Sequence, residues 1–236
     1  MSYDEGGKEM KILNLYAGIG GNRKKWILQD SDVVVAVEID PYIAAIYQKA
    51  FPNDIVIVGD AHEYLLEHFR EFDFIWSSPP CPTHSKVRKQ LAFKRRSDGT
   101  VFEQNKPVYP NMLLYQEIIL LQHYYKGLYC VENVVPYYEP LIEAQRIGRH
   151  LFWTNFEIPK IKVEPRGSFD NIEELALKLG YDLKDFYKVD KRIVLRNCVE
   201  PEIGEYIFSL VKTYQENEDF EKYIGDYKED KSNGNN

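Results

Sequence analysis

Short apolar runs alternate with amphipathic stretches through the first half of the chain. The apolar runs are rich in valine and isoleucine and are bounded by polar or turn-forming residues, so each predicts a strand. The predicted strands span residues 10–16, 32–40, 54–60, 71–80 and 128–134. The stretches between them predict helices at residues 22–30, 41–51, 61–69 and 111–127. Such alternation is typical of a mostly parallel sheet with helices on both faces, so the predicted fold class is α/β.

The later part of the chain follows a weaker pattern. We expect two strands within residues 149–163, a short helix over 168–180 that begins at Asp170 or Asn171 and stops at Gly180, and a last helix from Pro201. Earlier in the chain, Pro41 is predicted to open one helix and Gly127 to close another. From about Gln215 the chain is acidic and polar, which predicts a largely disordered tail.

Charge and cysteine content limit the classes of function. The formal net charge is −7, so a nucleic-acid site must be a local basic patch rather than a field over the whole protein. The cysteines Cys81, Cys130 and Cys198 form no CxxC pair, so neither a disulfide framework nor a metal site is expected. No apolar run is long enough to cross a bilayer and the N-terminal residues lack an apolar leader, which predicts a soluble cytoplasmic protein with no membrane partner.

Polar residues at the ends of the first three predicted strands suggest a nucleotide pocket. Gly18, Gly20 and Gly21 follow the first strand, where glycines allow a tight turn and a close ligand. Glu38 and Asp60 end the next two strands, and a carboxylate there can bind ribose hydroxyls or an adenine amino group. The combination predicts a cofactor that contains adenosine, and GxGG favours S-adenosylmethionine over NAD. The alternative is a glycine turn with two solvated acids.

Cys81 has the setting of a nucleophile. It follows two prolines at a predicted strand end, and such rigidity orients a reacting group in advance. Nearby positive charge favours a thiolate, and basic residues follow at Lys86, Arg88, Lys89, Lys94, Arg95 and Arg96. The alternative for any single cysteine is a small buried apolar residue, and we assign Cys130 and Cys198 to that class.

Glu132 and Asn133 end the next predicted strand, which is otherwise apolar. A buried carboxyl has a raised pKa and can act as a proton donor. The alternative is an acid that caps a turn before Pro136.

These residues carry a resemblance to a known family. The segments LYAGIGG, VEID, GDA, PPCPTHS, ENV, QRIGRHLF and RNCVEP occur in the order of the motifs of the DNA (cytosine-5) methyltransferases. The resemblance covers roughly residues 10–155 and 192–212, and it is to the small, bacteriophage-type members. It implies a Rossmann-like class I S-adenosylmethionine-dependent methyltransferase fold and double-stranded DNA as the substrate. It also implies a catalytic domain of residues 1–155 and 192–214, an insert at 156–191 and a tail at 215–236.

The resemblance also implies a role for each site residue. Cys81 would add to C6 of a flipped cytosine and Glu132 would bind N3, while Arg149 would hold the base and Asn133 the active-site loop. Cofactor contacts are expected from Tyr16, Gly18, Gly20, Gly21, Glu38, Ile39, Asp60, Ala61, Pro80 and Asn197. DNA contacts are expected from Ser85, Lys86, Arg88, Lys89, Lys94, Arg95 and Arg96. The alternative for this basic stretch is a solvated surface loop.

The chain departs from the family's pattern in ways that bear on function. At four motif positions the chain has a residue other than the one usual in the family. These residues are Pro82, His84, Ile147 and Arg196. Only residues 156–191 are available for target recognition, which predicts a short or relaxed recognition sequence, or a partner that supplies specificity. The other functions that we consider are an amino-group methyltransferase acting on cytosine N4 or adenine N6, a silent subunit that binds DNA or cofactor, and a methyltransferase acting on RNA.

Overall fold

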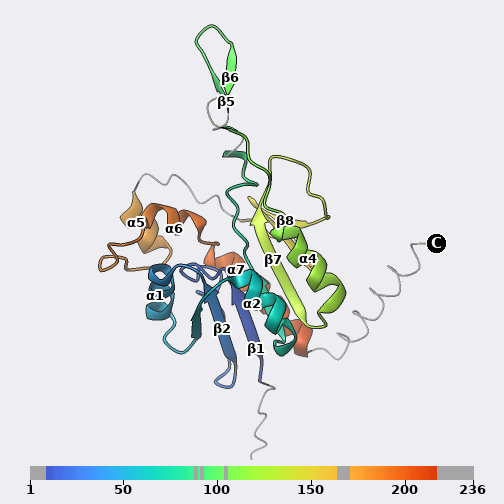
Figure 1. Ribbon diagram of the computed structural model, residues 1–236. Helices are drawn as coiled ribbons and strands as arrows, with labels where there is room; N and C mark the ends of the chain where they lie inside the picture. Colours follow the sequence, from blue (N-terminus) through green and yellow to red (C-terminus); the bar gives the residue numbers. More distant parts are fainter. Residues whose placement is uncertain (1–8, 88–89, 91–92, 104–105, 164–170, 217–236) are drawn as a thin grey trace, which may run out of the picture.

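The described part of the protein is built on a seven-stranded sheet flanked by helices (Figure 1). The computed structural model describes residues 9–87, 90, 93–103, 106–163 and 171–216. The strand order is β3-β2-β1-β4-β7-β9-β8. The bounds are β1 Lys11–Leu15, β2 Val33–Glu38, β3 Ile55–Val58, β4 Phe74–Ser77, β7 Leu128–Val134, β8 Gln145–Ile147 and β9 His150–Thr154. The first five of these strands along the sheet pair in parallel, and β9 pairs antiparallel with both β7 and β8. The predicted mostly parallel α/β sheet is confirmed.

The chain changes direction within this sheet between β1 and β4. It moves outward from β1 through β2 to β3, then crosses to β4 and continues outward to β7. At such a switch point the turns that follow two neighbouring strands diverge, and ligands bind in the crevice outside their carboxyl ends. The turn after Leu15 and the turn after Ser77 both open onto this crevice, because these two residues pair in register.

Helices cover both faces of the sheet, as predicted. Their bounds are α1 Pro41–Ala50, α2 Ala61–His68, α4 Leu113–Tyr124, α5 Ile172–Lys178, α6 Lys191–Asn197 and α7 Pro201–Glu216, with a short 3₁₀ turn η1 at Phe69–Glu71. Along β1, Ile12 packs in a cluster with α7, whereas Leu13 and Leu15 pack in a cluster with α2 and α4. Alternate residues of one strand therefore contribute to two separate cores, because successive side chains point to opposite faces.

Capping residues explain where several helices begin. Asp40 and Asp60 accept hydrogen bonds from the first backbone N–H groups of α1 and α2. Pro41 lies in the first turn of α1, as predicted. Asn171, one of the two predicted caps for α5, accepts from the helix, and Gly180 follows the helix with a φ of +72°. The other predicted cap, Asp170, lies outside the described residues.

The predicted helix over residues 22–30 is wrong, because α7 occupies that face of the sheet. This segment forms turns and irregular structure instead. A Cβ at Gly204 of α7 would lie 2.1 Å from the Asn22 carbonyl oxygen, so the two backbones are in direct contact. The indole of Trp26 is buried and donates to the Gly204 carbonyl at 3.1 Å. The segment is therefore held down by the last helix of the chain.

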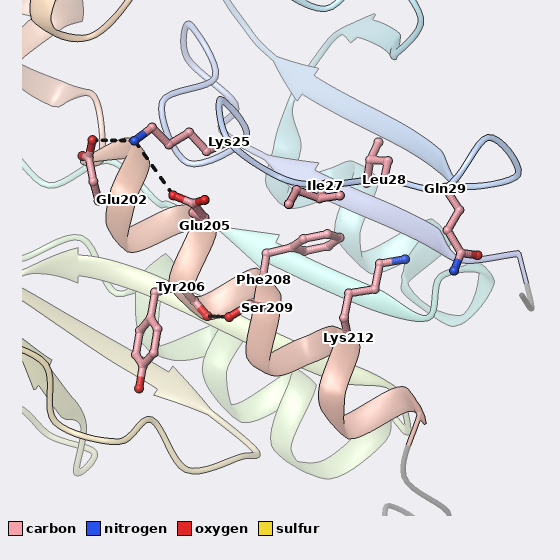
Figure 2. A pocket seen from close by; sticks show the side chains of 10 residues that line it. All are labelled: Lys25, Ile27, Leu28, Gln29, Glu202, Glu205, Tyr206, Phe208, Ser209 and Lys212. Atoms are coloured by element: carbon pink, nitrogen blue, oxygen red, sulfur yellow. Dashed lines mark hydrogen bonds and ion pairs between the residues drawn. The ribbon is translucent and has the colours of Figure 1, made fainter.

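The loop and α7 leave a groove between them. Figure 2 shows Ile27 and Leu28 on one side, Phe208 on the other, and Lys25 paired with Glu202 at one end. Its volume is about 610 Å³. Its lining includes none of the residues that the sequence predicts for the site.

Three further predictions need correction. Only one of the two strands expected within residues 149–163 forms, and its outer partner is the unpredicted β8. The helix α4 ends at Tyr124, and Gly127 serves instead to let Asp73 approach, since a Cβ there would lie 2.6 Å from the Asp73 carbonyl oxygen. Gln215 and Glu216 belong to α7, and the rest of the predicted tail lies outside the described residues.

A hairpin and a helix were also not predicted. The strands β5 Phe93–Arg95 and β6 Val101–Glu103 form a hairpin that begins in the basic stretch and ends beyond it, and the hairpin projects away from the sheet (Figure 1). The helix α6 packs with α5 against Ile43 and Ile46 of α1. Most of the segment expected to replace a recognition region therefore rests on the side of the sheet that carries α1 (Figure 1).

Candidate active site

The turn after β1 brings a carboxylate to the crevice. Tyr16, Gly18 and Gly20 all have positive φ values, of 53°, 55° and 83°. This turn aims the Gly18 N–H at Glu38 Oε2, at 2.9 Å, and the Asp40 N–H donates to Glu38 Oε1 at 3.0 Å. Each carboxylate oxygen can accept more than one hydrogen bond. Glu38 is therefore fixed in position with acceptor capacity left for hydroxyl groups.

The three glycines of this turn have different surroundings. A Cβ at Gly20 would lie 2.3 Å from the ring of Phe51, and one at Gly21 would lie 2.1 Å from Cys198 Sγ. These two glycines are required by packing against the rest of the protein. At Gly18, the nearest atom to a Cβ would be the Tyr16 carbonyl oxygen at 4.0 Å. Of the three, Gly18 is the one with open space for a ligand.

Residues at the ends of β2 and β3 complete this side of the crevice. Ile39 is 68% exposed, which is unusual for an isoleucine and leaves an apolar surface next to Glu38. Asp60 is exposed and uses Oδ1 to cap α2, accepting from the N–H groups of His62 and Glu63. Ala61 is buried at the first position of that helix. A carboxylate for a diol, an apolar face for a ring and a further acceptor fit the chemistry of an adenosine.

Sequence reasoning missed Glu117, a buried carboxylate beneath this crevice. It projects from α4 and accepts hydrogen bonds from Tyr16 Oη at 2.5 Å, Ser77 Oγ at 2.7 Å and His62 Nδ1 at 3.0 Å. Burial and Glu117 raise the pKa of Tyr16, so its hydroxyl stays a donor. The hydrogen bond to Glu117 raises the pKa of His62. The signal that could have revealed Glu117 is a carboxylate on the apolar face of a helix.

The loop that carries Cys81 is anchored at both ends. Asn133, which is 2% exposed at the end of β7, donates from Nδ2 to the Pro79 carbonyl oxygen at 2.9 Å. After the cysteine, the N–H groups of His84 and Ser85 both donate to the Cys81 carbonyl oxygen. Pro80 is exposed and Cys81 is partly exposed. These contacts hold the thiol at the end of β4.

The cation that lowers the pKa of Cys81 is Arg149, and not one of the basic residues that follow the cysteine in the sequence. Burial and the nearby Glu132 raise the pKa of the Cys81 thiol, while Arg149 lowers it. Lys86, the described basic residue nearest in sequence, does not contribute. The prediction that the following basic stretch activates the thiol therefore finds no support among the described residues.

Glu132 lies in a row of ionisable side chains. Its Oε1 is 3.7 Å from His150 Nε2, and His150 Nδ1 is 3.6 Å from Glu200 Oε2. Glu200 Oε1 is in turn 3.5 Å from an η nitrogen of Arg149. Burial raises the pKa of Glu132, against lowering effects from His150, a hydrogen bond with Ser78 and Arg149. The direction agrees with the sequence-based expectation of a raised pKa, whereas His150 and Glu200 were missed.

The structure gives fewer contacts for the predicted DNA-binding residues and for Asn197. Ser85 forms a bridge with Pro136, and Lys86 and Arg96 are exposed. Asn197 is exposed at the end of α6, beside Arg196, whose carbonyl oxygen lies 3.5 Å from Arg149. Arg88 and Lys89, and the side chains of Lys94 and Arg95, lie outside what the structure describes.

Two searches of the described residues gave negative results. In that part of the chain, no group of three or more histidine, cysteine, aspartate or glutamate residues is placed to hold a metal ion. No helix in the same part is both long and apolar enough to cross a membrane.

The sheet order, the antiparallel β9 inside the edge and the crevice at the switch point are those of a Rossmann-like α/β fold. Similar solved structures include a putative methyltransferase, yhhF, from Escherichia coli, with 16% identity, a TM-score of 0.39, and coverage of 61% of this chain and 74% of that one. Another is a mutant DNMT2 of Spodoptera frugiperda, with 26% identity, a TM-score of 0.34, and coverage of 53% and 35%.

Sequence comparison shows what the first part of the chain is similar to. Residues 10–108 match the family model described as C-5 cytosine-specific DNA methylase. The type II methyltransferase M.MspI of Moraxella sp is 27% identical over 96 residues, which are 41% of this chain and 22% of the relative. The tRNA (cytosine(38)-C(5))-methyltransferase of Spodoptera frugiperda is 31% identical over 85 residues, which are 34% and 26%. Over this part the chain is similar to C5 cytosine methyltransferases, and the match spans about a quarter of the length of these two proteins.

Proposed function

We propose that the protein transfers a methyl group from S-adenosylmethionine to C5 of cytosine in DNA, through a covalent bond to Cys81. The observation that carries the proposal is the convergence of Cys81, Glu132 and Arg149. They come from the ends of neighbouring strands, and both charged residues act on the pKa of the thiol. The family match includes Cys81 but ends before the other two, so their convergence is independent support.

The crevice suits the cofactor. Glu38 would accept hydrogen bonds from the ribose hydroxyls, Ile39 would pack on the adenine ring, and Asp60 would accept from the adenine amino group. Gly18 would leave room for the ligand. When bound, S-adenosylmethionine supplies an electrophilic methyl group.

Cys81 and Glu132 would act together on the base. The thiolate forms a bond to C6 of cytosine while the protonated Glu132 donates to N3, so the ring electrons are directed to C5. After C5 has gained the methyl group, it loses its proton to a base, and the bond between sulfur and C6 breaks. Because the charge of Glu132 raises the pKa of the thiol, a neutral Glu132 also makes the thiolate easier to form.

Arg149 and Asn133 would hold the reacting groups in place. Arg149, with a side chain 45% exposed, can reach a base or phosphate at the mouth of the site and stabilises the thiolate. Asn133 fixes the loop through the Pro79 carbonyl oxygen. A cytosine inside a duplex cannot reach Cys81, so the base must be flipped out. The basic residues that follow Cys81 would contact phosphates.

Target selection is a further part of the proposal. Base reading in the major groove needs several well-held side chains. The short segment between β9 and α6, which packs partly on α1, offers few for that purpose. We expect a short or relaxed recognition sequence, or a partner that supplies specificity.

The experiment that tests this function identifies the methylated atom. Purified protein is incubated with labelled S-adenosylmethionine and duplex DNA, single-stranded DNA or tRNA, and the nucleosides are then separated by mass. We expect 5-methylcytosine from DNA and none with Cys81→Ser. N4-methylcytosine or N6-methyladenine that persists in Cys81→Ser would instead support an amino-group methyltransferase, and product from tRNA alone would change the substrate class. No product from any of them would overturn the proposal.

A further inference from the structure

His150 lies between two carboxylates next to the proposed nucleophile. In the antiparallel pairing of β7 with β9, His150 is opposite Val134 and Phe152 is opposite Glu132. Because the side chains of opposite residues share a face, His150 and Glu132 are diagonal neighbours on one face of the sheet. The distance of 3.7 Å between His150 Nε2 and Glu132 Oε1 agrees with this arrangement.

Glu200 reaches the other nitrogen of the same ring. It precedes α7, and its carbonyl oxygen accepts hydrogen bonds from Ile203 and Gly204 in the first turn, which fixes its backbone. Its carboxylate lies 3.6 Å from His150 Nδ1. The imidazole thus lies between carboxylates from two segments that are far apart in the sequence.

The two inner side chains of this row are the least exposed. Glu132 is 8% exposed and His150 5%, Glu200 is 13% exposed and Arg149 45%. The two inner groups are almost removed from water, where charges act on one another more strongly than at the surface. The ionisation of Glu132 must therefore depend on the charges of its neighbours.

We propose that His150 and Glu200 are positioning residues that set the pH range in which Glu132 carries its proton. The inference rests on the proposed function, in which Glu132 must be protonated to act on the base. A protonated His150 favours the carboxylate form of Glu132, while the negative charge of Glu200 favours the acid form. His150 and Glu200 therefore shift the pKa of Glu132 in opposite directions, and a protonated His150 limits how far burial raises that pKa.

The other groups that face Glu132 do not account for its dependence on a neighbouring charge as His150 does. Cys81 and Cys130 lie near it on β4's loop and on β7, and the buried carboxyl raises the pKa of both thiols. Ser78 is a hydrogen-bond partner without a charge. Arg149 acts on Glu132 less than His150 does. His150 is the charged group with the largest effect on the Glu132 pKa, and burial opposes it.

The test measures the protonation of Glu132 directly. The protein is labelled with ¹³C in glutamate side chains, and the Glu132 carboxyl signal, assigned with Glu132→Gln, is followed as the pH changes. In His150→Gln the titration midpoint should rise by about one pH unit, because a positive neighbour is lost. Adding Glu200→Gln to that variant should bring the midpoint down again, because only a negative neighbour is then removed. His123→Gln, the same change at an exposed position of α4, should leave the midpoint unchanged.

A second measurement separates this inference from the proposed function. The alkaline limb of the pH profile of methylation should move in the same directions as the carboxyl midpoint. Shifted midpoints without methylation in the wild type would support the inference and overturn the function. Methylation by the wild type, with midpoints that stay unchanged in both variants, would support the function and overturn the inference. If His150→Gln does not fold, the wild type decides: a ¹⁵N signal of His150 should show an inflection at the Glu132 midpoint, and its absence would overturn the inference.

Discussion

Glu117 provides a test of how the crevice is built. Glutamine at this position keeps the size of the side chain, but it offers one acceptor oxygen and an amide donor to three groups that donate in the wild type. A hydrogen bond to a charged group contributes about 1.5–3 kcal/mol, and leaving a buried donor unpaired costs about 1–3 kcal/mol. We therefore expect Glu117→Gln to lower the free energy of unfolding by about 2–4 kcal/mol.

His62 gives this prediction a pH dependence. Its pKa is raised in the folded protein, with the hydrogen bond to Glu117 as the main cause. Such a group stabilises the fold fully below its ordinary pKa of about 6.5, and the contribution is lost as the pH rises through the raised value. The difference in unfolding free energy between the wild type and Glu117→Gln should be largest below about pH 6 and should decrease above the raised value. It should not vanish, because Ser77 does not titrate.

Urea unfolding at about pH 5.5 and about pH 8.5 measures this difference. Isothermal titration with S-adenosylmethionine gives a second result, an expected loss of at least about tenfold in affinity, because Tyr16 is part of the turn that shapes the crevice. Glu139→Gln, which neutralises an exposed carboxylate, is the matched control. Equal stability of Glu117→Gln and the wild type, or a difference that is the same at both pH values, would refute the reasoning.

Three other substitutions test separate parts of the structure. Gly204→Ala should lower the free energy of unfolding by about 1–3 kcal/mol in a urea titration, because its Cβ would collide with the Asn22 carbonyl oxygen; full stability would contradict the direct contact of α7 with that loop. Arg149→Met should raise the pKa of the Cys81 thiol, so alkylation of Cys81 by iodoacetamide should need a higher pH than in the wild type; an unchanged profile would remove Arg149 from the site. Asn133→Ala should reduce the methylation rate about tenfold or more by releasing the loop carbonyl, and a normal rate would show that the loop needs no anchor.

The strands could be predicted because parallel strands in the middle of a sheet are apolar on both faces. β1, β2, β4 and β7 were all recognised in this way, and the residues at their ends were therefore placed at one edge. The helix predicted over residues 22–30 failed for the opposite reason. Its amphipathic pattern is real, but the face that it would cover belongs to α7, and nothing local in the sequence reveals that competition.

The candidate site was predicted in part for a similar reason. Cys81 and Glu132 could be selected because their chemistry is unusual for a strand end. His150 and Glu200 could not, because their significance comes from partners in distant segments of the chain, and for Glu117 the apolar helix face gave a signal but not the partners. A carboxylate in a helix is read as exposed until its hydrogen-bond donors are known.

The central claim is that Cys81 attacks the C6 atom of a cytosine. A short duplex that contains 5-fluorocytosine, incubated with S-adenosylmethionine, tests it most directly, because fluorine at C5 prevents the final loss of a proton and traps the adduct. The account predicts a protein–DNA band on a denaturing gel, a mass that places the base on Cys81, and no band with Cys81→Ala. A methylated product without any adduct, or an adduct that persists in Cys81→Ala, would contradict it.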